Sequence, residues 1–237
     1  MENNQKKTIS RVPFLIALII VLGFPFAFFF YFRMKKHPEI LPEKVLPIYG
    51  KKTPIERNIN GKKTIDTIYQ IVPKFSFTDH LNRPFTNKDM NGKVFVVNYF
   101  FSTCPSICVD MVKNLKKIQS EFILDTDIRI LSLTVDPETD SVGTLYRYAQ
   151  DHEINSDKWL LLTGNKADLY NLARTGFLIT ATVGDGGPND FIHSEKLVLV
   201  DKEGRLRGFY DGTSDEAIEQ LKEDIKKLLV AYIVPRR

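Results

Sequence analysis

The sequence predicts an α/β domain in which helices flank a central mixed sheet, preceded by an N-terminal transmembrane helix. Two short apolar stretches, residues 94–101 and 128–135, are typical of buried strands, and a helical pattern follows each of them. An uncharged apolar run at residues 12–32 is long enough to cross a bilayer, because a helix rises about 1.5 Å per residue and the hydrocarbon core is about 30 Å thick. These observations indicate one folded domain and one membrane anchor.

The apolar run is interpreted as an uncleaved anchor, since no small-x-small cleavage pattern follows it as in a signal peptide. Residues 1–11 are then a cytoplasmic tail, and the proline-containing residues 33–63 an extended stalk. Basic residues flank the run equally on both sides, so the positive-inside rule gives no orientation. Because a short N-terminal tail normally stays in the cytoplasm, we expect a single-pass protein of the cytoplasmic (inner) membrane, with its domain on the extracytoplasmic, periplasmic side.

The net charge argues against a nucleic-acid partner. The chain carries +4, from 33 lysines and arginines and 29 aspartates and glutamates. Six basic residues and one acidic residue lie in the first 36, so the remaining residues sum to −1. A nucleic-acid surface would need clustered positive charge on the globular part. We therefore expect no nucleic acid among the partners.

The folded domain is expected over residues 64–237, and its first half is built around the strand at residues 94–101. Before that strand, residues 69–72 and 75–78 are predicted as short strands and residues 79–84 as a turn. After the helix that follows it, the pattern predicts a strand at 128–135, a helix at 141–152, a strand at 159–162 and a helix at 167–174.

The second half closes the sheet with a strand pair and a helix. A glycine- and aspartate-rich loop at 183–190 leads to predicted strands at 196–200 and 207–210. Ser214 is the expected N-cap of an amphipathic helix that runs to about Tyr232. Strands that alternate with helices, followed by a hairpin and a closing helix, indicate a fold of thioredoxin type.

Both cysteines of the chain, Cys104 and Cys108, lie where the central strand gives way to a helix. Pro105 fits the first helical turn because its missing N–H would have no intrahelical partner. Positions four apart share a helix face, so two sulfurs are presented side by side. The helix N-terminus favours thiolate, and we expect lowered thiol pKa values there.

A purely structural disulfide is the simpler interpretation of this pair, but the spacing argues against it. A bridge that closes roughly five residues removes only about 2 kcal/mol of unfolded-state entropy, against nearly 5 kcal/mol for a loop of about 100 residues. Redox chemistry and the binding of a soft metal therefore remain as the two alternatives.

Asp136 and the histidines are the other candidates for this site. Sites form at the carboxyl ends of strands in open α/β sheets, so Asp136, which follows the strand at 128–135, is expected near the thiols; the alternative is a turn residue before Pro137. His37 and His80 are expected in solvent, and His152 at a helix C-terminus, where a cation is favoured. His193 follows the 183–190 loop and stands just before the strand at 196–200, in a position that lies against the cysteine helix in thioredoxin-type folds.

Five segments together resemble the Sco/SenC family of copper proteins, which assist the assembly of cytochrome c oxidase. They are FSFTDH (75–80), FFSTCPSICVDM (100–111), LTVDPETD (133–140), WLLLTG (159–164) and FIHSEKLVLVDKEGRLRGFY (191–210). The resemblance covers about residues 64–232. One departure is Val109, since family members often have proline after the second cysteine.

The resemblance implies that Cys104, Cys108 and His193 bind one copper ion per domain. Thiolate sulfur selects Cu(I), imidazole also tolerates Cu(II), and three protein ligands fall short of the four usual for structural zinc. Asp136, Asp185 and Asp190 are considered as groups that contact the ligands or face a partner, and not as ligands. The implied partners are cytochrome c oxidase subunit II, other copper chaperones or thiol-disulfide reductants, and the membrane through the N-terminal helix.

The expected function is that of a membrane-anchored metallochaperone, not an enzyme, which delivers copper to the CuA centre of oxidase subunit II. The alternative is a thiol-disulfide reductase that keeps the cysteines of that subunit reduced; it needs Cys104 and Cys108 but not His193. Peroxidase action is a third possibility, because peroxiredoxins share the fold. Their reactive cysteine usually follows a Thr-x-x pattern, whereas Phe101 stands three residues before Cys104.

Overall fold

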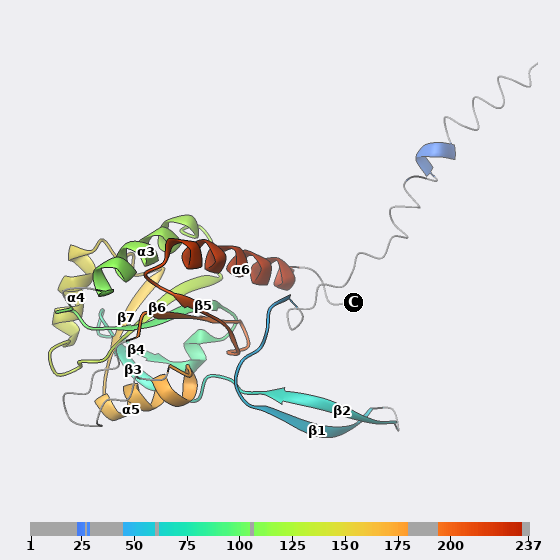
Figure 1. Ribbon diagram of the computed structural model, residues 1–237, viewed down its shortest axis with the longest axis horizontal. Helices are drawn as coiled ribbons and strands as arrows, with labels where there is room; N and C mark the ends of the chain where they lie inside the picture. The colour runs from blue at the N-terminus through green and yellow to red at the C-terminus, as the bar shows by residue number, and fades with distance from the viewer. Residues whose placement is uncertain are drawn as a thin grey trace, which may run out of the picture. The chain divides into compact units, whose positions relative to one another are not determined.

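The computed structural model describes residues 23–26, 28, 45–59, 62–104, 107–179 and 194–233 (Figure 1). The chain divides into two units at residues 40 and 41, and each is described by itself. In the first unit, residues 23–26 and 28 are helical. The rest of the predicted anchor at residues 12–32 lies outside the described residues. Within the described part of the chain, no helix combines the length and the apolar character that crossing a bilayer requires.

A mixed sheet forms the centre of the second unit, as the sequence predicts, and it has seven strands, of which the one at residues 84–86 was not predicted. Its strand order is β4-β3-β7-β6-β5-β8-β9, with β5, β6 and β7 parallel and the outer strands antiparallel to their neighbours. The strands are β3 (Ser76–Asp79), β4 (Pro84–Thr86), β5 (Val94–Phe100), β6 (Ile128–Thr134), β7 (Trp159–Thr163), β8 (Lys196–Val200) and β9 (Leu206–Asp211). Every residue of β5 is buried, because helices cover both faces of the sheet at this central strand.

Side chains of β5 alternate between two apolar clusters, one on each face of the sheet. Val94, Val96 and Phe100 pack with residues of α3, α4 and α6, whereas Phe95, Val97 and Tyr99 pack with residues of α5 and η2. Figure 1 shows α3 and α6 on one side of the sheet and α5 on the other. The helical segments are η1 (Asn87–Met90), α3 (Ile107–Glu121), α4 (Val142–Asp151), α5 (Lys166–Asn171), η2 (Leu172–Gly176) and α6 (Asp215–Ile233). The predicted helix at 167–174 is therefore α5 followed by a π-type turn, η2.

A second sheet precedes this one and replaces part of the expected stalk. Strands β1 (Lys52–Ile59) and β2 (Lys62–Tyr69) form a two-stranded antiparallel hairpin. Residues 52–59 were expected to be extended and unpaired, but they pair along their whole length with β2, from Lys52↔Tyr69 to Ile59↔Lys62. The predicted strand at 69–72 is wrong beyond Tyr69, where Pro73 lacks the N–H that a strand ladder uses.

His80 lies in a turn as predicted, but the expectation that it is solvated is wrong, since it is 1% exposed. The turn folds against β7, which pairs with β3. His80 Nδ1 accepts a hydrogen bond from the Leu161 backbone N–H (3.2 Å), so the proton lies on Nε2, which donates to the Ser156 hydroxyl (2.9 Å). Burial lowers the pKa of His80 below its ordinary value of 6.5 and keeps the ring neutral.

This histidine makes stability depend on pH. The pKa is lower in the folded state than in the unfolded state, so the stabilising effect is present above about pH 6.5 and is lost as the pH falls below it. We expect the free energy of unfolding to fall between about pH 6.5 and 5. In His80→Asn, the amide oxygen keeps an acceptor for the Leu161 N–H and does not titrate, so the decline should be shallower. Chemical denaturation at several pH values measures both slopes, and equal slopes would contradict this role.

Candidate metal centre

The two cysteines lie where the sequence predicts, between the carboxyl end of β5 and the start of α3. The Cys104 backbone N–H donates to the Phe101 carbonyl (3.2 Å), which turns the chain away from β5. Cys108 lies in the first turn of α3 and is 4% exposed, whereas Cys104 is partly exposed. Neither cysteine is in a disulfide, and the Cys108 thiol is hydrogen-bonded to Cys104. The structure therefore confirms that the two sulfurs are side by side, with one facing solvent and one facing the core.

The expectation that the helix N-terminus lowers the thiol pKa is wrong for Cys108. The pKa of the Cys108 thiol is raised from its ordinary 9.0 to about 12. Burial is the main cause, and the hydrogen bond to Cys104 is the second. Desolvation of the thiolate inside the apolar cluster thus outweighs the helix dipole at this position. In the reduced, metal-free protein Cys108 is a thiol, and a metal ion must displace its proton to bind.

The carboxylate that orders the cysteine loop is Asp140, which the sequence analysis did not identify. Asp140 is fully buried, and its oxygens accept from the Ser102 backbone N–H (3.2 Å), the Ser102 hydroxyl and the Thr134 hydroxyl. These bonds join the loop before Cys104 to the carboxyl end of β6. A signal was present in the sequence, since a hydroxyl residue at position 134 ends a buried strand and needs a polar partner.

Asp136, the carboxylate that was expected near the thiols, has the interactions of a turn residue. Its backbone carbonyl accepts from the N–H groups of Thr139 and Asp140, and its own N–H donates to the Thr134 hydroxyl (2.9 Å). Asp136 is partly exposed, whereas Asp140 is inside. The structure therefore favours the turn interpretation of Asp136.

Aromatic side chains from the sheet and α4 close the other side of the thiol pair. The Tyr148 ring lies 5.4 Å from that of Phe100, and it packs on the apolar cluster that contains Cys108. Burial raises the pKa of Tyr148, and negative charge on Cys108 and Cys104 would raise it further, so its hydroxyl stays protonated. His152 is the C-cap of α4, as predicted, and its ring lies 4.2 Å from that of Tyr148, tilted by 46°. Burial lowers the pKa of His152, so the expected cation is not favoured there.

His193, Asp185 and Asp190 lie outside the described residues. The structure does describe where the chain resumes: Ser194 precedes β8, which pairs antiparallel with β5 through Val97↔Val198 and Phe95↔Val200. The amino end of β8 therefore lies toward the carboxyl end of β5, where the cysteines are. Among the residues that the structure describes, no group of three or more His, Cys, Asp or Glu side chains is arranged to hold a metal. A third ligand would have to come from elsewhere in the chain.

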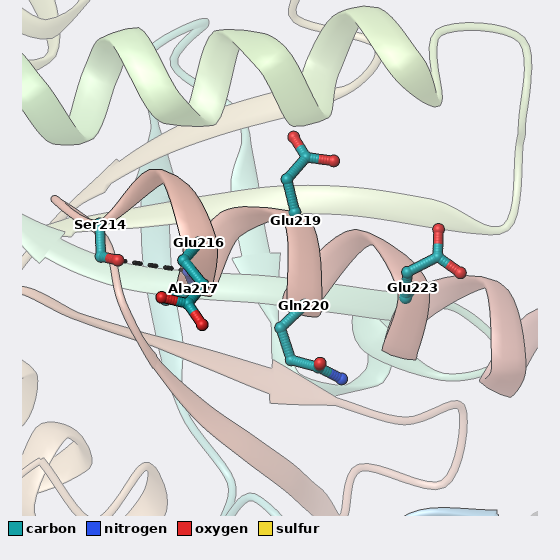
Figure 2. A pocket seen from close by; sticks show the side chains of 6 residues that line it. All are labelled: Ser214, Glu216, Ala217, Glu219, Gln220 and Glu223. Carbon is teal, nitrogen blue, oxygen red and sulfur yellow. Dashed lines mark hydrogen bonds between the residues drawn. The ribbon is translucent and has the colours of Figure 1, made fainter.

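An open hollow on α6 lies apart from the thiols and does not suit a soft metal. Figure 2 shows its lining along one helix, with the Ser214 hydroxyl accepting from the Ala217 backbone N–H (3.3 Å). The other lining residues are Glu216, Glu219, Gln220 and Glu223. These offer oxygen ligands and no sulfur or imidazole. We assign no site to this face.

Comparison with known proteins identifies the family. The SCO1/SenC family model matches residues 64–230, which is more than half of the chain. The chain belongs to the SCO1/SenC family. This confirms the resemblance inferred from the sequence, and the matched range contains both cysteines, Asp140 and His193.

Individual Sco proteins are similar over the same region. The mouse protein named "Protein SCO2 homolog, mitochondrial" is 28% identical over 163 residues, which cover 67% of this chain and 62% of the mouse protein; the match thus spans less than two thirds of that relative. A SCO1/SenC family lipoprotein from Bacillus anthracis has a crystal structure that is 28% identical, with a TM-score of 0.60, covering 67% of this chain and 95% of that one. The crystal structure of yeast Sco1 with copper bound is 25% identical, with a TM-score of 0.51, covering 66% of this chain and 88% of that one.

Proposed function

We propose that this Sco protein is a membrane-anchored copper metallochaperone that binds one copper ion through Cys104, Cys108 and His193 and delivers it to the CuA centre of cytochrome c oxidase subunit II. The observation that carries the proposal is the pair of adjacent cysteines at the carboxyl end of β5, neither of which is in a disulfide. Two thiolates are soft ligands that favour Cu(I). The copper-bound yeast Sco1 and the description of the Sco family as cytochrome c oxidase assembly proteins support the metal and the pathway.

The path of the chain supports His193 as the third ligand. The Glu195 carbonyl accepts from the Gly212 N–H (2.6 Å), and the Gly212 carbonyl accepts from the buried Asn114 side chain of α3 (2.9 Å). Glu195 is thus connected through Gly212 to α3, the helix that holds Cys108. Residue 193 stands two positions before this link, a chain length of at most about 7 Å, and it precedes the amino end of β8, which lies toward the carboxyl end of β5.

The different exposure of the two sulfurs suits metal transfer. Cys108 is buried and packed in the core, so it holds its position, whereas Cys104 is partly exposed. A thiolate of the receiving subunit would reach the ion from the side of Cys104 and replace that ligand first. The anchor at residues 12–32 would keep this exchange beside the membrane in which the oxidase is assembled.

The experiment that tests this proposal is an anaerobic Cu(I) titration of the full-length reduced protein in detergent. We expect one equivalent to bind tightly, with the ultraviolet absorption of Cu(I)-thiolate bonds. A reduced protein that binds no Cu(I) would contradict the proposal.

Oxidation should abolish Cu(I) binding. A Cys104–Cys108 disulfide leaves no thiolate for the metal, and the hydrogen bond between the two thiols shows that the sulfurs are close enough to bridge. We expect the oxidised protein to bind essentially no Cu(I) and to recover one equivalent after reduction. Competition with a Cu(I)-specific chelator measures both states. Retention of tightly bound copper by the oxidised protein would show that the thiols are not the ligands.

A thiol-disulfide reductase that acts on the cysteines of subunit II is the second candidate. The partly exposed Cys104 suits attack on a disulfide, and the buried Cys108, hydrogen-bonded to it, suits resolution of the mixed disulfide. His193 has no part in this reaction. The behaviour of a His193 variant therefore separates the two functions.

A further inference from the structure

The β1–β2 hairpin is positively charged, although residues 37–237 together have a net charge of −1. The hairpin, residues 52–69, contains four basic and two acidic residues, a net charge of +2, and Lys51 and Lys74 lie just outside it, whereas residues 75–237 contain 20 basic and 24 acidic residues, a net charge of −4. Both acidic residues of the hairpin are paired across the strands, Asp66 with Arg57 (3.1 Å) and Glu56 with Lys63 (3.8 Å). The hairpin is therefore a basic element on an acidic domain.

The hairpin also exposes large apolar side chains. Ile65 is 79% exposed and Ile68 is 51% exposed, and each lies on a different face because residues three apart in a strand point in opposite directions. A two-stranded hairpin with no covering layer is marginally stable in water. Lys63 and Ile65 are two apart in β2 and share one face, which therefore combines the basic and apolar groups that bind the interface of a membrane.

The base of the hairpin is tied to the end of the sheet opposite the cysteines. The Val72 N–H donates to the Gly204 carbonyl (2.8 Å), in the turn between β8 and β9. That turn lies at the amino end of β5, since Val200 pairs with Phe95, whereas Cys104 follows the carboxyl end. Figure 1 shows the hairpin projecting on the side of the domain away from α4. A protein that takes copper from the thiols would therefore contact the end of the domain that lies away from the hairpin.

The segment that leads to the hairpin is fixed to this same end. Arg207 is 1% exposed and donates to the backbone carbonyls of Leu46 (2.7 Å) and Pro47 (3.0 Å). Only residues 33–44 separate the apolar run from Val45, a length of at most about 40 Å when extended. Each strand of the hairpin is about 27 Å long. A bilayer that holds the apolar run thus lies within range of the hairpin.

We infer that the β1–β2 hairpin docks on an anionic phospholipid surface. Its lysines lie among the headgroups, and Ile65 enters the boundary with the acyl chains. We infer a lipid surface, and not an acidic protein, as the binding partner because the proposed function places a membrane anchor at residues 12–32. Docking of the hairpin would turn the amino end of β5 toward the bilayer and leave Cys104 facing away from it.

Tryptophan fluorescence of the full-length protein in vesicles tests this docking. The chain has one tryptophan, Trp159, which is 1% exposed in the core and is therefore shielded from lipid. Any quenching by lipid then reports on a tryptophan that is added at the surface. We expect Ile65→Trp to be quenched by brominated phospholipid in vesicles that contain phosphatidylglycerol. In purely zwitterionic vesicles, or with Lys52 and Lys63 both replaced by glutamate, quenching should be several-fold weaker, because each lysine near an anionic surface strengthens binding about fivefold.

Two matched variants separate failure of the docking from failure of the anchor. Tyr146→Trp, at a 47% exposed position on α4, should not be quenched, whereas Phe24→Trp in the apolar run should be quenched if that run lies in the bilayer. Quenching at position 24 with none at position 65 would overturn the docking and leave the anchor intact. Quenching at position 65 that does not depend on lipid charge, or equal quenching at position 146, would also overturn it. No quenching at position 24 would overturn the anchor.

Discussion

Replacement of Cys104 or Cys108 by serine is expected to abolish tight Cu(I) binding. A structural zinc site with four ligands binds with about 10–16 kcal/mol, so each ligand is worth about 3 kcal/mol, or more than a hundredfold in affinity. A serine hydroxyl is a hard, neutral ligand and does not replace a thiolate toward Cu(I). Competition of each full-length variant with a Cu(I) chelator measures the loss.

Cys108→Ser also places a hydroxyl in an apolar cluster, so its folding has to be checked by circular dichroism. Cys104→Ser is the cleaner variant, because Cys104 is partly exposed. His193→Ala completes the set: we expect a loss of about a hundredfold in Cu(I) affinity and a fall in the copper content of the oxidase in cells. Full oxidase copper content in the His193→Ala strain would instead favour the reductase.

Asp140→Asn is expected to give the largest loss of stability among substitutions near the site that leave both sulfurs in place. The asparagine amide group presents donors toward Ser102 and Thr134, which are themselves donors to Asp140. Each buried donor left without an acceptor costs about 1–3 kcal/mol, so we expect the free energy of unfolding to fall by about 3 kcal/mol. The loop before Cys104 loses its fixed position as well, and Cu(I) affinity should fall by about tenfold, as for other groups that orient metal ligands.

Asp136→Asn is the matched control, since Asp136 acts through its backbone and its side chain is partly exposed. We expect its free energy of unfolding to change by less than about 0.5 kcal/mol and its copper affinity to stay the same. Denaturant titration and chelator competition give both quantities. If Asp136→Asn loses copper affinity and Asp140→Asn keeps it, the carboxylate that orders the loop has been misassigned.

Local patterns predicted most elements of the domain. Strands β5, β6 and β7 appear as short apolar runs because both faces of the sheet are covered, and the start of α3 follows from the apolar spacing after Cys104. The hairpin was missed, because the charged residues and the proline at 51–57 are not typical of a strand and its partner strand was not predicted either. The burial of His80 was missed because a turn is covered only when another strand packs on it, and β7 is far away in the sequence.

The sequence by itself determined the fold class, the family and the placement of two sulfurs at a junction between strand and helix, because these depend on residues that are near one another in the chain. Only the tertiary structure decided that Cys108 holds its proton, that Asp140 and not Asp136 orders the cysteine loop, and that a basic hairpin stands opposite the thiols. The pKa of a thiol, the partners of a carboxylate and the separation of charge depend on which distant surfaces meet. The order of residues along the chain does not specify these contacts one by one.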